Sequence, residues 1–378
     1  MFLRRDPAPA AVLERVRRAV EALEDPEIHR PLGELKMLRG VTAERGGVRV
    51  EVALTTARSP TADRLRDDIV AAAVVAGAPG VQVHFSVMTE RDRMEVAQHL
   101  RAISGSADAV TGRRSPASRV YAVASGKGGV GKSSVTANLA VGLALAGQRV
   151  GVLDADVWGY SMPQLFGVRR SPVALKGLML PVEAHGVRLM STGFFVDDEE
   201  PVIWRGPMLH KALQQFVEDV HWGELDVLLL DLPPGTGDVT LSLLELLPEA
   251  ALLAVTTPQP AAQTVAARVG RMALDMRMPI AGVIENMSAM VCQQCHHQSQ
   301  LFGSGGGQRL ATALSAPLLG QIPLDTALRE AGDCGTPVVL RTPSAASSTE
   351  LLRVAAALPT ARRSLVGRPL SLTVVRGA

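Results

Sequence analysis

The segment SGKGGVGKSS, residues 125–134, constrains the fold of this chain more than any other stretch. It follows the apolar run 120–124, precedes a helix-like segment and fits the pattern G-x-x-x-x-G-K-[ST]. Glycines allow the backbone N–H groups of such a loop to surround phosphates, and the N-terminus of the following helix attracts their negative charge. The segment therefore predicts a nucleotide phosphate site on a strand–loop–helix unit.

Two lysines of this loop have different expected roles. Lys132 adds a positive charge at the phosphates, and Ser133 can bind Mg²⁺. Lys127 cannot easily fold back onto phosphates that its own backbone surrounds, so we expect it to reach a nucleotide on a facing subunit. A solvated surface lysine is the alternative. The residues expected at the nucleotide are Gly126, Lys127, Gly128, Gly129, Val130, Gly131, Lys132, Ser133 and Ser134.

Aspartates follow two of the apolar runs, where the carboxyl ends of parallel strands meet a ligand crevice. Asp154 and Asp156 are expected to share a strand face, Asp154 in the magnesium shell and Asp156 activating water. Asp231 is expected to hold Mg²⁺ through water. Gly235, in DLPPGTGD, can present its N–H to the γ-phosphate and move when that phosphate leaves. Helix or turn capping by the aspartates is the alternative.

Short apolar runs separated by helix-length segments predict a doubly wound, mainly parallel sheet with helices on both faces. These runs are 120–124, 150–153, 227–230, 251–255, 280–284 and 317–321. Before them, helical periods (9–24, 61–77) and alternating strands (48–54, 81–87) predict a small α+β domain. The expected organisation is an α+β domain (1–92), a linker with a possible helix near 94–103 (93–118), a P-loop ATPase domain (119–360) and a tail (361–378).

Composition argues against several classes of partner. The net charge is +2 and aromatic residues make up 3%, so we expect neither a nucleic-acid surface nor an anionic membrane partner. We expect no signal peptide. The three cysteines are too few for a disulfide framework and favour a reducing compartment, so a cytoplasmic protein is expected.

Two of the cysteines, Cys292 and Cys295, form a Cys-x-x-Cys pair. Two thiolates cannot complete the four-coordinate shell of zinc or of an iron–sulfur cluster. His296, His297, an acceptor protein or the same pair from a second subunit could close the shell. A redox disulfide is the remaining interpretation.

The pattern K-G-G-x-G-K-S resembles the deviant Walker A loop of the SIMIBI group, which includes MinD, ParA and the nitrogenase iron protein; this resemblance implies a nucleotide-sandwich homodimer. The wider set SGKGGVGKSS, DADVWGYSMP, WRGPMLHKALQQF, DLPPGTGD and ENMS…CQQC…LFGSGGG resembles the Mrp/ApbC family, relatives of the Nbp-type cluster scaffolds. That resemblance implies an ATPase with ATP and Mg²⁺ as cofactors. It also implies a [4Fe–4S] cluster bridged between subunits by Cys292 and Cys295, and transfer to apo iron–sulfur proteins. Asn286 then becomes an adenine contact, with a turn-forming asparagine as the alternative.

The first domain resembles the MIP18-like module, most clearly in DPEIHRPLGELKM. It departs from many such modules because no cysteine follows the strand at 48–54, so it is expected to be a docking or regulatory module. Cys334 is expected to be an incidental thiol.

Two other functions stay open at this point. One is a MinD/ParA-like positioning switch that attaches to membrane or DNA when ATP binds. The other is a zinc-bound adaptor ATPase, which would differ in metal content.

Overall fold

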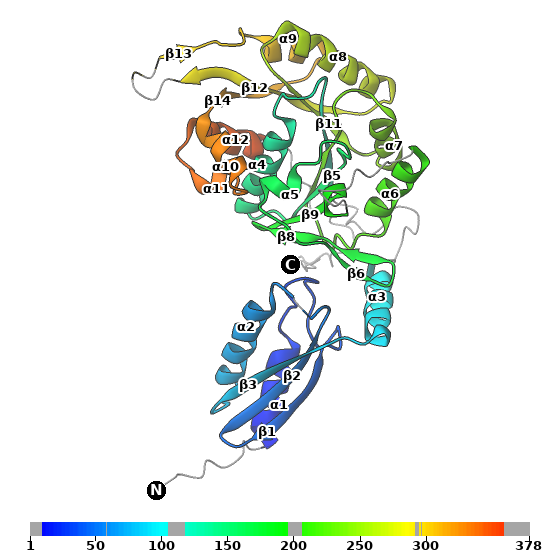
Figure 1. Ribbon diagram of the computed structural model, residues 1–378, viewed down its shortest axis with the longest axis vertical. Helices are drawn as coiled ribbons and strands as arrows, with labels where there is room; N and C mark the ends of the chain where they lie inside the picture. Colours follow the sequence, from blue (N-terminus) through cyan, green and yellow to red (C-terminus); the bar gives the residue numbers. More distant parts are fainter. Residues whose placement is uncertain are drawn as a thin grey trace, which may run out of the picture.

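The computed structural model describes residues 10–57, 59–104, 118–195, 206–291, 295 and 297–358 (Figure 1). The first domain is a three-stranded sheet covered by helices. Strand β1 pairs antiparallel with β2, and β2 pairs parallel with β3. Its elements are α1 (Ala10–Glu21), β1 (Leu38–Glu44), β2 (Gly47–Leu54), α2 (Ala62–Val75), β3 (Val81–Val87) and α3 (Glu90–Ser104).

Apolar periodicity explains why these helices pack on this sheet. Val12, Val16 and Val20 recur every four residues of α1, so they lie on one helix face, and all three are buried. Helix α3 adds Val96 and Leu100 to the same core. The core of the first domain therefore continues past residue 92, where the linker is predicted to begin. The apolar residues of α3 are separated by charged ones, so the sequence pattern does not show that this helix is buried on one side.

The second domain contains a nine-stranded sheet in the order β13-β12-β11-β4-β10-β5-β9-β8, with β14 also paired to β12. All six predicted runs are strands of this sheet, and neighbouring strands among them pair in parallel. They are β4 (Arg119–Ser125), β5 (Val150–Asp154), β10 (Val227–Asp231), β11 (Ala251–Thr256), β12 (Ile280–Val291) and β14 (Leu318–Leu324). The predicted α/β class with a doubly wound sheet is confirmed.

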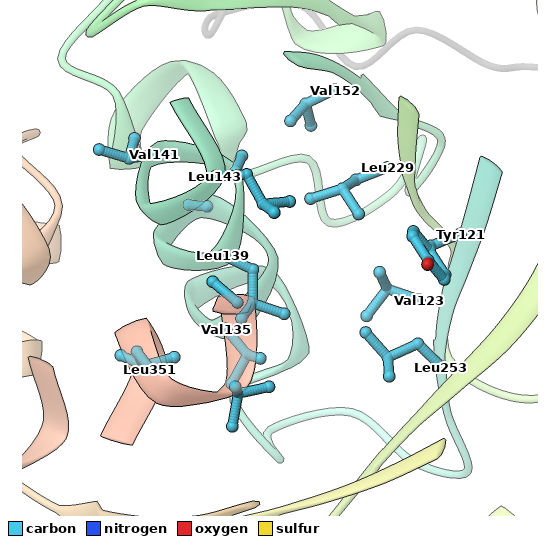
Figure 2. Close-up of a cluster of buried hydrophobic side chains, with 14 of the residues drawn as sticks. Tyr121, Val123, Val135, Leu139, Val141, Leu143, Val152, Leu229, Leu253 and Leu351 are labelled. Atoms are coloured by element: carbon cyan, nitrogen blue, oxygen red, sulfur yellow. The ribbon is translucent and has the colours of Figure 1, made fainter. Parts of the chain in front are cut away.

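Helices cover both faces of the sheet because successive side chains of each strand point to opposite sides. Tyr121 and Val123 of β4 face α4 (Lys132–Leu145) and share one core with α12 (Ala346–Ala357), which lies on the other side of α4 (Figure 2). Val120 and Ala122 pack in the opposite core with α6 (Gly206–Glu218), α7 (Asp238–Leu246) and α8 (Pro260–Asp275). The remaining helices are α5 (Met162–Leu165), η1 (Thr192–Phe194), α9 (Gly306–Ala313), α10 (Thr326–Asp333) and α11 (Val338–Arg341).

Sequence patterns did not reveal four short strands between residues 173 and 191. Strands β8 (Val182–Ala184) and β9 (Val187–Ser191) extend the main sheet, whereas β6 (Val173–Leu175) and β7 (Leu178–Leu180) form a separate hairpin. Leu175, Leu178 and Leu180 of this hairpin are buried in the core of the first domain. The β6–β7 hairpin and α3 thus join the two domains (Figure 1).

In the parts of the chain that the structure describes, none of the helices combines the length and apolar character that crossing a bilayer requires. The predicted tail, 361–378, lies outside the described residues.

Candidate nucleotide-binding site and cysteine hairpin

The predicted phosphate loop connects β4 to α4 and leaves open space along one side. A Cβ atom built on Gly128 or Gly129 would meet no heavy atom within 4 Å. Gly129 and Gly131 have φ angles of 77° and 80°, a left-handed conformation that favours glycine. No side chain caps the N-terminus of α4, so its first N–H groups are available to an anion. This cradle fits nucleotide phosphates.

Asp231, at the end of β10, organises the polar groups beside the loop. Its Oδ2 lies 2.7 Å from Nζ of Lys132 and accepts a 2.6 Å hydrogen bond from the Ser133 hydroxyl. Its Oδ1 accepts a 2.9 Å hydrogen bond from Thr136. Carboxylate and hydroxyl oxygens are ligands that Mg²⁺ prefers, so Ser133 and Asp231 fit the expected metal ion. Thr136 was not predicted, although its position four residues after Lys132 places both on one face of α4.

Asp154 is fully buried and is used to hold a loop. Its carboxylate accepts hydrogen bonds from the N–H groups of Asp156 (3.2 Å), Ser161 (3.2 Å) and Met162 (3.1 Å), and from the Ser191 hydroxyl (3.0 Å). Burial, and then the nearby charge of Asp231, raise the pKa of Asp154 to about 7. Asp154 therefore fixes the segment that follows β5.

Asp156 lies in that segment rather than in the strand. The expectation that Asp154 and Asp156 share a strand face is wrong, because β5 ends at Asp154. The Asp156 carboxylate accepts a 3.0 Å hydrogen bond from the Gly159 N–H, and burial raises the pKa of Asp156. Its predicted role with water stays a prediction.

Two further predicted residues have partners within the chain. The ammonium of Lys127 donates a 2.9 Å hydrogen bond to Oε1 of Gln259, a residue that the sequence did not single out. The Gly235 N–H donates to the carbonyl oxygen of Ser125 at 2.8 Å, so a contact with a phosphate requires that bond to break. Gly235 has a φ angle of 90°, which favours glycine at this turn.

A cavity of about 370 Å³ lies next to the phosphate loop and is lined by Gly131, Ser134, Asn286, Met287, Leu324 and Leu328, among others. Asn286 donates a 2.9 Å hydrogen bond from Nδ2 to the carbonyl oxygen of Val130. Its Oδ1 is buried and has no hydrogen-bond partner within the described part of the chain. An unpaired amide oxygen beside an apolar cavity fits the amino group of a base, so the predicted adenine contact suits this geometry.

Cys295 belongs to a hairpin at one edge of the sheet, which we call the cysteine hairpin. Strand β12 continues beyond its last pair with β11, Thr256–Glu285, and then pairs antiparallel with β13 (Gln298–Ser299). Cys295 lies between β12 and β13 and is exposed, and the hairpin extends away from the helices (Figure 1). Cys292 and His296 lie outside the described residues. Cys334, just after α10, is also exposed.

A glycine-lined phosphate loop, an aspartate at the end of the neighbouring parallel strand and an adjoining cavity define a P-loop NTPase. The family model described as NUBPL iron-transfer P-loop NTPase matches residues 117–359, and this chain belongs to that family. A second model, described as iron-sulfur cluster assembly protein, matches residues 13–85.

Two curated relatives match this chain over most of its length. The chain is 47% identical to the "Iron-sulfur cluster carrier protein" of Mycobacterium tuberculosis, with 96% of this chain and 97% of the relative covered. It is 42% identical to the protein of the same name from Bacillus subtilis, with 82% and 88% covered. A solved nucleotide-binding protein from Archaeoglobus fulgidus, in complex with ADP, is similar with a TM-score of 0.52 and 36% identity, covering 58% of this chain and 87% of that one. The predicted family resemblance is confirmed.

Proposed function

We propose that this protein binds and hydrolyses ATP, carries a [4Fe–4S] cluster at a homodimer interface and transfers it to apoproteins. The observation that carries the proposal is the exposed position of Cys295 at the end of a hairpin of a P-loop NTPase. The names of the relatives support the cluster as the cargo. Exposed thiolates suit a cluster that must leave, because solvent and acceptor proteins can reach it.

The residues around the phosphate loop have separate roles in this proposal. Mg²⁺, when bound, offsets negative charge on the phosphates, and Ser133 and Asp231 would hold it. Lys132 exchanges its buried contact with Asp231 for a phosphate oxygen. Asp156 orients water, and Lys127 of one subunit serves the nucleotide of the other. Because the lysine and the thiolates both need a second copy, dimer formation couples nucleotide binding to cluster binding.

Anaerobic reconstitution with ferrous iron and sulfide tests the cargo. We expect about four iron and four sulfide ions for every two chains, since Cys₄ ligation requires four thiolates. Cys292→Ala and Cys295→Ala should each abolish cluster binding. Cys334→Ala is the matched control and should keep the full iron content, because this exposed thiol lies on another element. Full iron content in the Cys292→Ala and Cys295→Ala variants would refute the assignment.

Transfer and location are further parts of the proposal. We expect loaded protein to restore the absorbance of an apo four-iron ferredoxin, and we place this activity in the cytoplasm, whose reducing conditions keep thiols available. Sedimentation with liposomes or DNA tests the positioning-switch alternative, which predicts that the protein sediments with one of them when ATP is present. Metal analysis of anaerobically purified protein separates the zinc alternative, which predicts zinc in place of iron.

A further inference from the structure

We propose that Gln259 is a positioning residue that holds Lys127 on its own subunit until a facing nucleotide displaces it. The inference rests on the proposed use of Lys127 by a second subunit. In the described part of the chain the contact recorded for the Lys127 ammonium is the 2.9 Å hydrogen bond to Oε1 of Gln259, and both side chains are partly exposed. The Lys127 side chain is therefore fixed by Gln259 while it stays accessible to a second subunit.

The chemistry of this contact makes it exchangeable. Gln259 offers a neutral amide oxygen, which attracts the lysine ammonium less strongly than an oxygen that carries negative charge. A phosphate oxygen of a facing nucleotide is charged, so it competes successfully for the lysine. A carboxylate at position 259 would compete on equal terms with the phosphate and retain Lys127.

The backbone around Gln259 is fixed on both sides. Gln259 is the N-cap of α8 and stands between Pro258 and Pro260, whose rings restrict the local backbone angles. Helix α8 also touches the phosphate loop directly: a Cβ on Gly126 would lie 2.2 Å from the backbone nitrogen of Ala266. Gln259 and the loop that carries Lys127 therefore belong to one packed unit.

The first residues of α9, which follow the cysteine hairpin, contact this unit. A Cβ on Gly306 would meet the carbonyl oxygen of Pro258 at 2.7 Å, so only glycine allows the approach. The next residue, Gly307, donates its N–H to the buried carboxylate of Glu285 on β12, the strand that leads to the cysteines. A contiguous set of contacts thus runs from the cysteine hairpin through Gly306 and Pro258 to Gln259, and this gives the segment LFGSGGG a physical role.

The rate of ATP hydrolysis per chain, measured against protein concentration, tests the proposal. For the wild-type protein the rate should rise to a plateau as dimers form. Gln259→Glu should raise the concentration for half-maximal rate by roughly five- to tenfold, because the stronger contact retains Lys127. Added salt should shrink this difference, since it screens a partly exposed ion pair. Gln259→Ala should lower the half-maximal concentration, because nothing retains the lysine.

Matched variants separate positioning from a structural effect. Gln263→Glu adds the same charge one turn along α8, where the side chain contacts Arg309, and should leave the curve unchanged. The affinity of the isolated chain for ADP should be the same in all variants. Gly306→Ala should shift the curve by at least about threefold in the wild-type background and not in the Gln259→Ala background, as expected for coupled residues.

Each result has a defined meaning. A wild-type rate that does not depend on concentration contradicts the proposed dimer function, and the role of Gln259 fails with it. A concentration-dependent wild type with an unchanged Gln259→Glu curve overturns the role of Gln259 alone. Equal shifts in the same direction for Gln259→Glu and Gln259→Ala indicate a structural effect and also overturn it. A Gly306→Ala shift of equal size in the wild-type and Gln259→Ala backgrounds also overturns the role of Gln259.

Discussion

The ammonium of Lys132 lies 2.7 Å from Oδ2 of Asp231, and both side chains are buried at the base of the phosphate loop. Without nucleotide, each of these charges neutralises the other. Removing one partner of a buried pair leaves an uncompensated charge and costs about 3–5 kcal/mol. In the proposed function, the pair keeps both buried charges compensated in the free protein and is exchanged when phosphates bind.

Asp231→Asn should accordingly destabilise the nucleotide-free protein by about 3 kcal/mol, and added ADP should recover part of the loss because phosphates supply the missing negative charge. ATP hydrolysis should fall at least about 100-fold through loss of the metal ligand. Thermal unfolding with and without ADP measures the loss of stability and its recovery. Asp275→Asn, at the end of α8, is the control and should change neither quantity. Equal destabilisation with and without ADP would contradict the exchange.

Two glycines of the phosphate loop should respond differently to an added methyl group. Gly128→Ala should unfold at the same temperature as the wild type, because its Cβ would meet no atom within 4 Å. Its affinity for ADP should fall at least about tenfold, since the methyl group occupies the phosphate space. Gly131→Ala should lose about 2 kcal/mol or more of stability, because its φ is 80° and its Cβ would lie 2.2 Å from Nδ2 of Asn286. ADP titration measures the affinity of each variant, and thermal unfolding measures its stability. Normal ADP binding by Gly128→Ala would contradict the assignment of this loop as the phosphate site.

Asp25 of the first domain should make stability depend on pH. Burial raises the pKa of Asp25 from 3.8 to about 6, so between these values the unfolded chain loses its proton while the folded chain keeps it. Stability should therefore fall as pH rises through this window, by at most about 3 kcal/mol, and stay lower above it. Asp25→Asn removes the effect while its amide oxygen can still accept the N–H groups of Glu27 and Ile28.

Chemical denaturation at pH 4 and pH 7 measures this difference. The stability of Asp25→Asn relative to the wild type should be greater at pH 7 than at pH 4. A difference that is the same at both pH values would show that Asp25 titrates normally in the folded protein.

The shared core between the domains predicts that a residue of the second domain stabilises the first. Leu178 of the β6–β7 hairpin is fully buried in the core of the first domain. Leu178→Ala should cost about 2–5 kcal/mol and increase hydrogen exchange in β2 and α2. Val75→Ala, at a side chain that is 88% exposed, should have little effect. Unchanged exchange in the first domain would mean that the hairpin does not contribute to its stability.

The phosphate loop and the parallel strands could be predicted from sequence because local pattern determines them. Glycine spacing specifies the loop, and strands buried on both faces are continuously apolar, as at β4 and β10. The hairpin Val173–Leu175 and Leu178–Leu180 could not be predicted, since each strand has three residues and its partner core is far away in the sequence. The sequence predicts a linker with a possible helix near 94–103 where α3 lies, because the apolar residues of α3 are few among charged ones.

The contacts of the site were less predictable than its residues. Motif and strand position predict Lys132, Asp154 and Asp231 as site residues. The four donors around Asp154 come from β9, from the loop after β5 and from the start of α5, which only the fold brings together. Gln259 precedes α8 between two prolines, a pattern that signals a helix start and nothing more. Its contact with Lys127 depends on the neighbouring positions of β4 and β11 in the sheet.

Native mass spectrometry of anaerobically reconstituted protein tests the central claim, that two chains complete one cluster site. We expect a species of two chains with four iron and four sulfide ions, which reverts to apo protein on mixing with an apo acceptor. The Cys295→Ala protein should carry no cluster. A single chain that retains a complete cluster and hydrolyses ATP at the full rate would contradict the account.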